Sequence, residues 1–246
     1  RKETELSQQK FTVSKSALEQ FFSGCPAKLT FYRKYNLAKM PPVLARGIAV
    51  HKFMEAEPDE KDLSPEAESA RRLLNWVEKN NYRILATEVK HIAPLTDDIQ
   101  LFGIIDAIAL DEDDMPVLLD WKTGTQQWQA FTLETGEIVW PNALGWQGTI
   151  YLTPPYENDI IEEWPDRMKY VMVAEYGTVQ DYDYWANEED LQNLIRCAQI
   201  MKDAHDRGYF PKHKGYLCRS CDWFSACYQT KGWERHYIDR KQDESR

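Results

Sequence analysis

The spacing of hydrophobic and polar positions along the chain changes twice, from helical to strand-like and back. Apolar residues recur at helical spacing over residues 14–22, in "ARGIAVHKFMEAE" (45–57) and over 65–80, which predicts three helices. The stretches "RILATEVKHIAPL", "IQLFGIIDAIAL" and "VLLDWK" follow and predict strands. Residues 167–185 have the pattern of a hairpin, and residues 142–152 and 187–207 have that of helices.

The connections between these elements are shorter or more polar. Gly24-Cys25-Pro26 breaks the first helix before a second short one, and residues 123–139 and the tail from Tyr209 are expected to be irregular. The order of elements predicts an α/β (α+β) fold, in which a central, mostly antiparallel sheet is flanked by helices. We expect a single domain over residues 1–246, with a helical part (12–82), a sheet core (83–186) and a C-terminal helix and tail (187–246).

Composition narrows the class of protein. Hydrophobic residues make up 43% of the chain, which is enough for a folded core and excludes a disordered protein. The chain has no apolar run as long as a membrane span, and its first residues, "RKETELSQQK", lack the apolar stretch of a signal peptide. We therefore expect a cytoplasmic protein without a membrane partner.

The net charge of −10 argues against a protein that coats nucleic acid over its whole surface, although it permits a local basic channel. A basic stretch near the N-terminus is one candidate wall for such a channel, and a solvated helix face is the equal alternative. It consists of Lys28, Arg33, Lys34, Lys39 and Arg46. Four tryptophans could stack single-stranded bases or simply pack, namely Trp128, Trp140, Trp146 and Trp223.

An acidic pair and a lysine lie at the ends of two apolar strands. Side chains alternate along a strand, so Asp120 and Lys122 point the same way. If the hairpin turn centres near Asp113, Asp106 lies directly opposite Asp120. Two carboxylates this close need a cation between them, and hard oxygen ligands suit Mg²⁺ or Mn²⁺. The alternative is a solvated hairpin with a cross-strand salt bridge.

Cysteines form a second candidate metal site. Three of the five fall at Cys218, Cys221 and Cys227, and Cys25 lies near the N-terminus. Four thiolates suit either tetrahedral Zn²⁺ or a 4Fe–4S cluster, and free thiols remain an alternative. His213 is a substitute zinc ligand, and Cys197 fits a core thiol on the last long helix.

Together these motifs resemble the PD-(D/E)XK nuclease superfamily, in its RecB-like branch. "GIIDAIALDEDDMPVLLDWKTG" is similar to the nuclease core, "RGIAVH" to the upstream helix with a metal-binding His, and "QGTIY" to the Q-x-x-x-Y helix. "SGCP" with "CRSCDWFSAC" is similar to the split four-cysteine iron–sulfur signature of the AddB nuclease domain and the CRISPR-associated RecB-like exonucleases. The motifs occur in the order that the branch has them.

The resemblance implies a restriction-endonuclease-like core, in which a central mixed sheet is flanked by helices and an iron–sulfur staple joins the N-terminal helices to the C-terminal tail. It also implies a role for each matching residue. His51, Asp106 and Asp120 would bind Mg²⁺ or Mn²⁺, with Glu88 as a weaker candidate for a metal or water contact. Lys122 would serve the attacking water. The remaining matches would support these groups or hold the cluster: Gln147 and Tyr151 would position Lys122 or a phosphate, and Cys25, Cys218, Cys221 and Cys227 would bind 4Fe–4S, with Zn²⁺ as the alternative. Apart from the resemblance, Glu55 lies four residues after His51 on one face of the predicted helix, and we expect it to orient the His51 ring.

The resemblance also implies an activity and an origin. We expect a metal-dependent DNA exonuclease acting on single-stranded or frayed ends, in the reducing cytoplasm of a bacterium or archaeon or encoded by a phage. It would work in recombination, repair or mobile-element processing, with a recombinase, annealing protein, helicase or integrase as partner. Two alternatives are a DNA-end-binding or adaptor subunit and a CRISPR-adaptation nuclease that trims DNA before integration.

Overall fold

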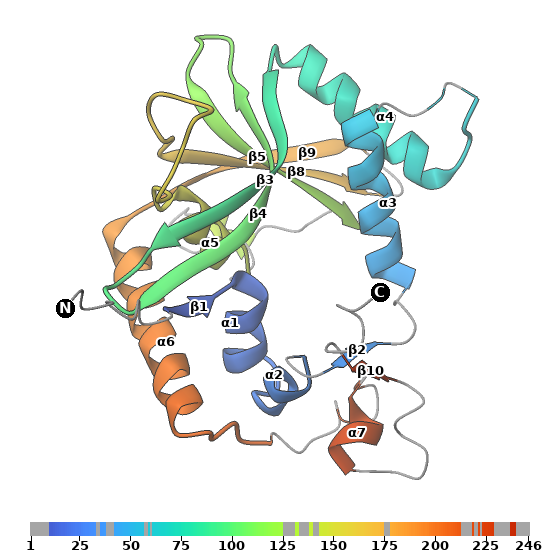
Figure 1. Ribbon diagram of the computed structural model, residues 1–246. Helices are drawn as coiled ribbons and strands as arrows, with labels where there is room; N and C mark the ends of the chain where they lie inside the picture. Colours follow the sequence, from blue (N-terminus) through green and yellow to red (C-terminus); the bar gives the residue numbers. More distant parts are fainter. Residues whose placement is uncertain are drawn as a thin grey trace, which may run out of the picture. The chain divides into compact units, whose positions relative to one another are not determined.

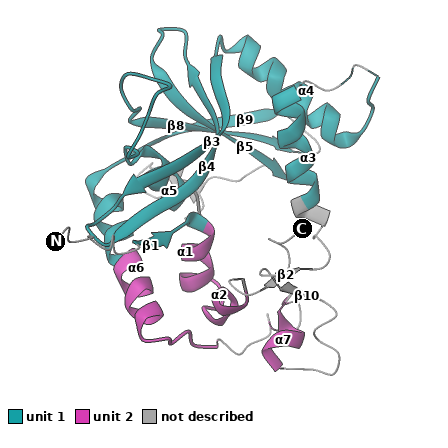
Figure 2. Ribbon diagram, viewed as in Figure 1, with its two compact units in different colours: residues 1–15, 43–196 teal, residues 16–42, 197–246 magenta. Residues whose placement is uncertain are grey.

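The computed structural model describes residues 10–32, 35–37, 42–56, 59, 61–124, 131–132, 138–139, 143–174, 178–212, 218, 221, 223–228 and 237–239. These residues form two compact units, coloured separately in Figure 2. The first comprises residues 1–15 and 43–196, and the second comprises residues 16–42 and 197–246. The second unit therefore combines segments from the two ends of the chain.

The first unit is built on a six-stranded mixed sheet with the order β1-β4-β5-β8-β9 and β3 paired to β4 (Figure 1). The pairings β3–β4, β4–β5 and β8–β9 are antiparallel, whereas β1–β4 and β5–β8 are parallel. The strands are β1 (Phe11–Val13), β3 (Arg83–Pro94), β4 (Ile99–Leu110), β5 (Pro116–Gly124), β8 (Arg167–Ala174) and β9 (Val179–Trp185). The predicted mixed sheet with helical flanks is confirmed.

One face of this sheet carries the hydrophobic core beneath α3 (Pro42–Ala56) and α4 (Pro65–Lys79). The α4 helix begins where sequence signals place it, because the Ser64 hydroxyl accepts the Ala67 N–H at 3.2 Å and Pro65 occupies the first turn. Its apolar stripe packs on alternate residues of the strands. The buried core residues include Leu73, Trp76, Ala107, Leu119, Trp121 and Val171.

The opposite face is covered by α5 (Ala143–Leu152). Tyr170, Tyr182 and Tyr184 alternate with the core-facing residues of β8 and β9 and so point to this second face. The Tyr184 ring lies directly over Gly148, where a Cβ would come within 2.2 Å of it. This close approach, and the bond between the hydroxyls of Thr149 and Tyr184 at 2.6 Å, fixes α5 against the sheet.

The second unit is smaller and combines short elements from both ends of the chain. It contains α1 (Lys15–Phe22), α2 (Ala27–Tyr32), α7 (Phe224–Tyr228) and a two-stranded sheet of β2 (Tyr35–Leu37) with β10 (Tyr237–Asp239). The rings of Phe31 and Trp223 stack with centroids 5.8 Å apart, and Trp223 is fully buried. The long helix α6 (Glu188–Asp206) passes from the first unit into the second.

Three sequence predictions differ from the structure. The region 123–139 is not wholly irregular, because β5 extends to Gly124 and a small hairpin joins β6 (Phe131–Thr132) to β7 (Ile138–Val139). The tail is not wholly irregular either, since it forms α7 and β10. The β1 strand was missed, because three residues pairing in parallel with β4 leave no local periodicity to detect.

Candidate active site

The hairpin of β4 and β5 brings the two predicted aspartates together. Ala107 pairs with Leu119 in the antiparallel ladder, and Asp106 and Asp120 are the next residues on the two strands. The predicted register, centred on Asp113, is therefore confirmed. Both carboxylates are buried, and the Trp121 backbone N–H donates to Asp106 Oδ2 at 2.7 Å.

The surroundings of the Asp106 carboxyl disfavour its charged form. Burial, and secondly the neighbouring Asp120 carboxylate, raises the pKa of Asp106 to about 7. His51 and Lys122 oppose this increase in the pKa without cancelling it. A site that raises the pKa of one carboxyl in this way lacks positive charge, and a divalent cation would supply it.

Asp120 lies deepest and is held from both sides. Gln147 Nε2, from α5, donates to Asp120 Oδ1, and Lys122 Nζ forms an ion pair with Asp120 Oδ2. Tyr170 pairs with Asp120 in the parallel β5–β8 ladder, and its ring lies 5.8 Å from Lys122 Nζ. Burial, then the Asp120 charge, raises the pKa of Tyr170 well above its usual value, so this phenol stays neutral. Sequence analysis overlooked Tyr170, although the alternation in "RMKYVMVA" was a signal for it.

His51 and Glu88 complete a potential metal site with Asp106. One oxygen or nitrogen from each of the three residues lies within 4.8 Å of the others. His51 Nδ1 is 3.3 Å from Glu88 Oε1 and 3.6 Å from Asp106 Oδ1. Among the described residues this is the one such group of three or more His, Cys, Asp or Glu side chains. The two carboxylates suit Mg²⁺ or Mn²⁺, and the imidazole favours Mn²⁺.

The backbone of Glu88 is in an unusual conformation. Its φ is 51°, in the left-handed region that non-glycine residues rarely occupy. The irregularity lies in the middle of β3, between Thr87 paired with Ala107 and Val89 paired with Ile105. Residues held in such conformations cluster at functional sites. The conformation of Glu88 and its closeness to His51 and Asp106 both support it as a residue of this site.

The remaining predicted residues lie close by with other partners. Tyr151 is buried, and its hydroxyl donates to the Ile104 carbonyl at 2.6 Å. Its predicted role in positioning Lys122 or a phosphate stays a prediction. Its ring fills the space that a Cβ on Gly103 would need. Glu55 is exposed and lines the same depression as His51, but the structure shows no hydrogen bond between the two described side chains. Glu55 as the partner of His51 stays a prediction.

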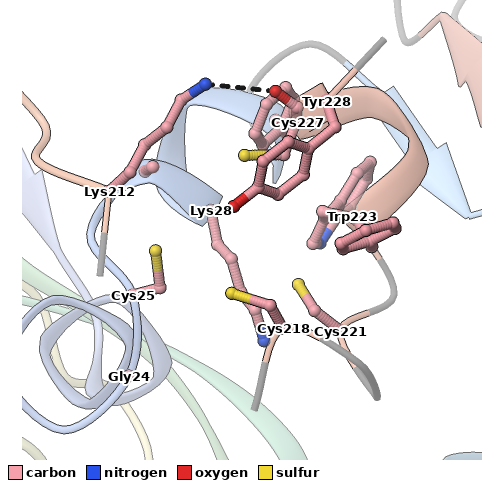
Figure 3. Close-up of a pocket in the computed structure, with 12 residues that line it drawn as sticks. Gly24, Cys25, Lys28, Lys212, Cys218, Cys221, Trp223, Cys227 and Tyr228 are labelled. Carbon is pink, nitrogen blue, oxygen red and sulfur yellow. Dashed lines mark hydrogen bonds between the residues drawn. The ribbon is translucent and has the colours of Figure 1, made fainter. Parts of the chain in front are cut away.

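The four predicted cluster cysteines line one cavity of about 100 Å³ in the second unit (Figure 3). Cys25 precedes α2, and Cys218, Cys221 and Cys227 come from the other end of the chain. No three of these described thiols bring their sulfur atoms within 4.8 Å of one another. A single tetrahedral zinc needs sulfur atoms about 3.8 Å apart, from a Zn–S bond of about 2.3 Å, so the described thiols do not already form a zinc site with three or more of these ligands.

Other candidates have more ordinary settings or lie outside the described residues. Trp223 is buried against Phe31 and is not accessible to bases, Cys197 is half-buried, and Lys28 lines the cysteine cavity. Arg46 and Trp146 are half-buried. The predicted residues that lie outside the described ones are Trp128, Trp140, Arg33, Lys34, Lys39 and His213.

Comparison with known proteins identifies the family. A model of the PD-(D/E)XK nuclease superfamily matches residues 61–228, more than half of the chain, and the chain therefore belongs to this superfamily. A crystal structure of a candidate exonuclease from Eubacterium rectale is 13% identical with a TM-score of 0.52, over 94% of this chain and 98% of that one. At that identity the likeness concerns the fold.

A second structure, of the protein SSO0001, is 14% identical with a TM-score of 0.43, over 87% of this chain and 84% of that one. A search of curated proteins finds no match. Among the described residues, no helix is long and apolar enough to cross a membrane.

Proposed function

We propose that this protein is a divalent-metal-dependent deoxyribonuclease that removes nucleotides from single-stranded or frayed DNA ends. The observation that carries the proposal is the convergence of His51, Glu88 and Asp106 beside the ion-paired Asp120 and Lys122. Superfamily membership and the raised pKa of Asp106 support the same reading.

The chain's own residues would divide the work of hydrolysis. His51, Glu88 and Asp106 would hold the ion, and Asp120 lies beside them as a further carboxylate. A divalent ion supplies Lewis acidity to a phosphate oxygen and to water. Lys122, fixed by Asp120, would orient the attacking water and stabilise negative charge that develops on the phosphate. Gln147 keeps the Asp120 carboxylate in place, which holds Lys122 within reach.

The decisive experiment is digestion of end-labelled linear and covalently closed circular single-stranded DNA, with Mg²⁺ or Mn²⁺. We expect loss of the linear strand alone, abolished in Lys122→Ala and retained in Lys79→Ala, which removes an exposed lysine at the end of α4. The position of the surviving label gives the polarity. Cleavage of circles would make the enzyme an endonuclease. Absence of cleavage from both substrates would favour a DNA-end-binding or adaptor subunit instead.

We also propose that the second unit holds a 4Fe–4S cluster on Cys25, Cys218, Cys221 and Cys227. The cavity that the four thiols share, and the similarity of their positions in the sequence to the split iron–sulfur signature, support this proposal. A cluster there would tie the ends of the chain together. Protein purified without oxygen should be brown and contain iron and acid-labile sulfide, both reduced in Cys25→Ser. Stoichiometric zinc without iron would overturn the proposal.

The pathway follows from the resemblance alone. A role in recombination, repair or CRISPR adaptation predicts capture of a recombinase, annealing protein, helicase or integrase by the tagged protein. Since the CRISPR reading requires an integrase, co-purification with purified integrase separates it from the others.

A further inference from the structure

Two lysines beside the metal-binding triad are not committed to any carboxylate. Lys52 follows His51 in α3, and Lys90 lies two residues beyond Glu88 in β3. Both are exposed, and among the described residues neither forms an ion pair or a side-chain hydrogen bond. Five other cations of the first unit do pair with carboxylates: Arg71 with Glu68, Arg83 with Asp114, Lys122 with Asp120, Arg167 with Asp111, and Lys169 with Asp181 and Asp183.

Each of these lysines is accompanied by an exposed isoleucine. Ile48 lies one helical turn before Lys52, and both line the depression of about 360 Å³ that contains His51 and Glu88. Ile104 is the direct cross-strand partner of Lys90 in the β3–β4 ladder. The two isoleucines are 38% and 45% exposed, so each offers apolar surface that a ligand at the metal site would remove from water.

The second pair points toward the metal site. Ile104 precedes Asp106 by two positions in β4, so their side chains share a face about 7 Å apart along the strand. Lys90 lies opposite Ile104 and shares that face. The triad therefore has a cation and an apolar side chain on the α3 side, and a second such pair on the β3–β4 side.

We propose that Lys52 and Lys90 bind the phosphates on either side of the scissile one, and so hold a single DNA strand across the metal centre. Ile48 and Ile104 pack against the adjoining bases. This inference rests on the proposed nuclease function and names the residues that position its substrate. A chain with a net charge of −10 needs such local cations to approach a polyanion.

The exposed isoleucines favour a single DNA strand over a duplex as the ligand. In a duplex the base faces are stacked and the edges paired, so little apolar surface is left for Ile48 or Ile104. An unpaired strand exposes its bases, and packing against them contributes affinity without sequence preference. The lysines would fix the backbone and the isoleucines the bases.

The first test measures Kd for a labelled single-stranded oligonucleotide, with Ca²⁺ in place of the catalytic ion, and KM and kcat with Mg²⁺ or Mn²⁺. Lys52→Gln and Lys90→Gln should each raise Kd and KM about three- to tenfold and change kcat less than about twofold. Each should also make the slope of log Kd against log salt shallower by about 0.7, the value for one phosphate contact on a single strand. Lys52→Arg and Lys90→Arg should behave as wild type.

Lys79→Gln is the matched control. Lys79 is exposed at the end of α4, and β3 begins only after it, with Arg83 already about 16 Å along the strand from Glu88. This variant should leave Kd, KM and the salt slope unchanged.

A second pair of variants tests the base contacts. Ile48→Ser and Ile104→Ser should raise KM on ordinary single strands but not on an oligonucleotide of abasic residues, whereas the lysine variants should raise KM on both. Isoleucine variants that match wild type on ordinary strands would overturn the base contacts.

The outcomes separate this inference from the proposed function. If wild type cleaves nothing, the proposed function fails. If wild type cleaves, Lys122→Ala does not, and both lysine variants match Lys79→Gln in Kd and salt slope, then the nuclease stands and the strand path proposed here is wrong.

Discussion

The stability of the metal-free protein should depend on the ionisation of Asp106. Its carboxyl is buried beside Asp120, and the pKa of Asp106 is raised from an ordinary 3.8 to about 7. Below the lower value the group is protonated in both the folded and the unfolded chain. Between the two values only the unfolded chain releases the proton, so the free energy of unfolding falls as the pH rises.

The structure sets the size of this effect. At about 1.4 kcal/mol for each pH unit between the two pKa values, the loss of stability reaches an upper limit of about 4 kcal/mol. About 2–3 kcal/mol of it accumulates between about pH 5 and about pH 7. Asp106→Asn removes the charge but keeps an oxygen that can accept the Trp121 N–H, a bond of 2.7 Å in the wild type.

The assay is urea unfolding in EDTA at these two pH values. Asp106→Asn should be more stable than wild type at the higher pH, and the difference between the two proteins should grow by about 2–3 kcal/mol from the lower pH to the higher. Saturating Mn²⁺ should stabilise wild type strongly and the variant weakly, since only wild type offers the charged ligand. Parallel pH dependence of the two proteins, within about 0.5 kcal/mol, would refute the reasoning.

Three further substitutions probe the framework of the site. Gly148→Ala places a Cβ 2.2 Å from the Tyr184 ring and should cost about 1–3 kcal/mol, measured as a lower urea midpoint; an unchanged midpoint would contradict the packing. Glu88→Gly should give a more stable metal-free protein than Glu88→Ala, by about 1–2 kcal/mol, because φ is 51° there; the reverse order would show a relaxed strand. Gln147→Leu leaves Asp120 without its amide donor and should destabilise by about 1–3 kcal/mol and reduce cleavage, whereas full activity would show that Lys122 alone positions the carboxylate.

Much of the fold could be predicted from the sequence, because the signals for its helices and hairpins are local. The α4 helix is indicated by Ser64 and Pro65 at its start and by a clear apolar stripe along it. The β4–β5 hairpin follows from two apolar strands on either side of an acidic turn, and its register fixed the proximity of Asp106 and Asp120 in advance. Where a turn sets the register, the neighbours of every residue on the hairpin follow.

Glu88 shows what local signals could not supply. Its place in the site depends on pairing with β4 and on a left-handed φ in the middle of β3, and no glycine or turn residue marks that conformation. The surroundings of Tyr151 likewise depend on residues distant in the sequence. Its helix position was evident, but the space for its ring is provided by Gly103 on another element, and the bond from its hydroxyl to the Ile104 carbonyl depends on that packing.

The aspartate pair and Glu88 are both held in unfavourable positions by the surrounding sheet. Asp106 and Asp120 are held on strands whose neighbours are fully buried, so they cannot move apart to relieve their repulsion. Glu88 is held toward them by a backbone conformation that costs about 1–2 kcal/mol for a residue with a side chain. The carboxylate repulsion and the backbone strain both destabilise the metal-free protein, and a bound cation offsets the repulsion. The stability lost at Asp106 and the affinity gained for metal should therefore be two measurements of the same interaction, linked through the proton that the ion displaces.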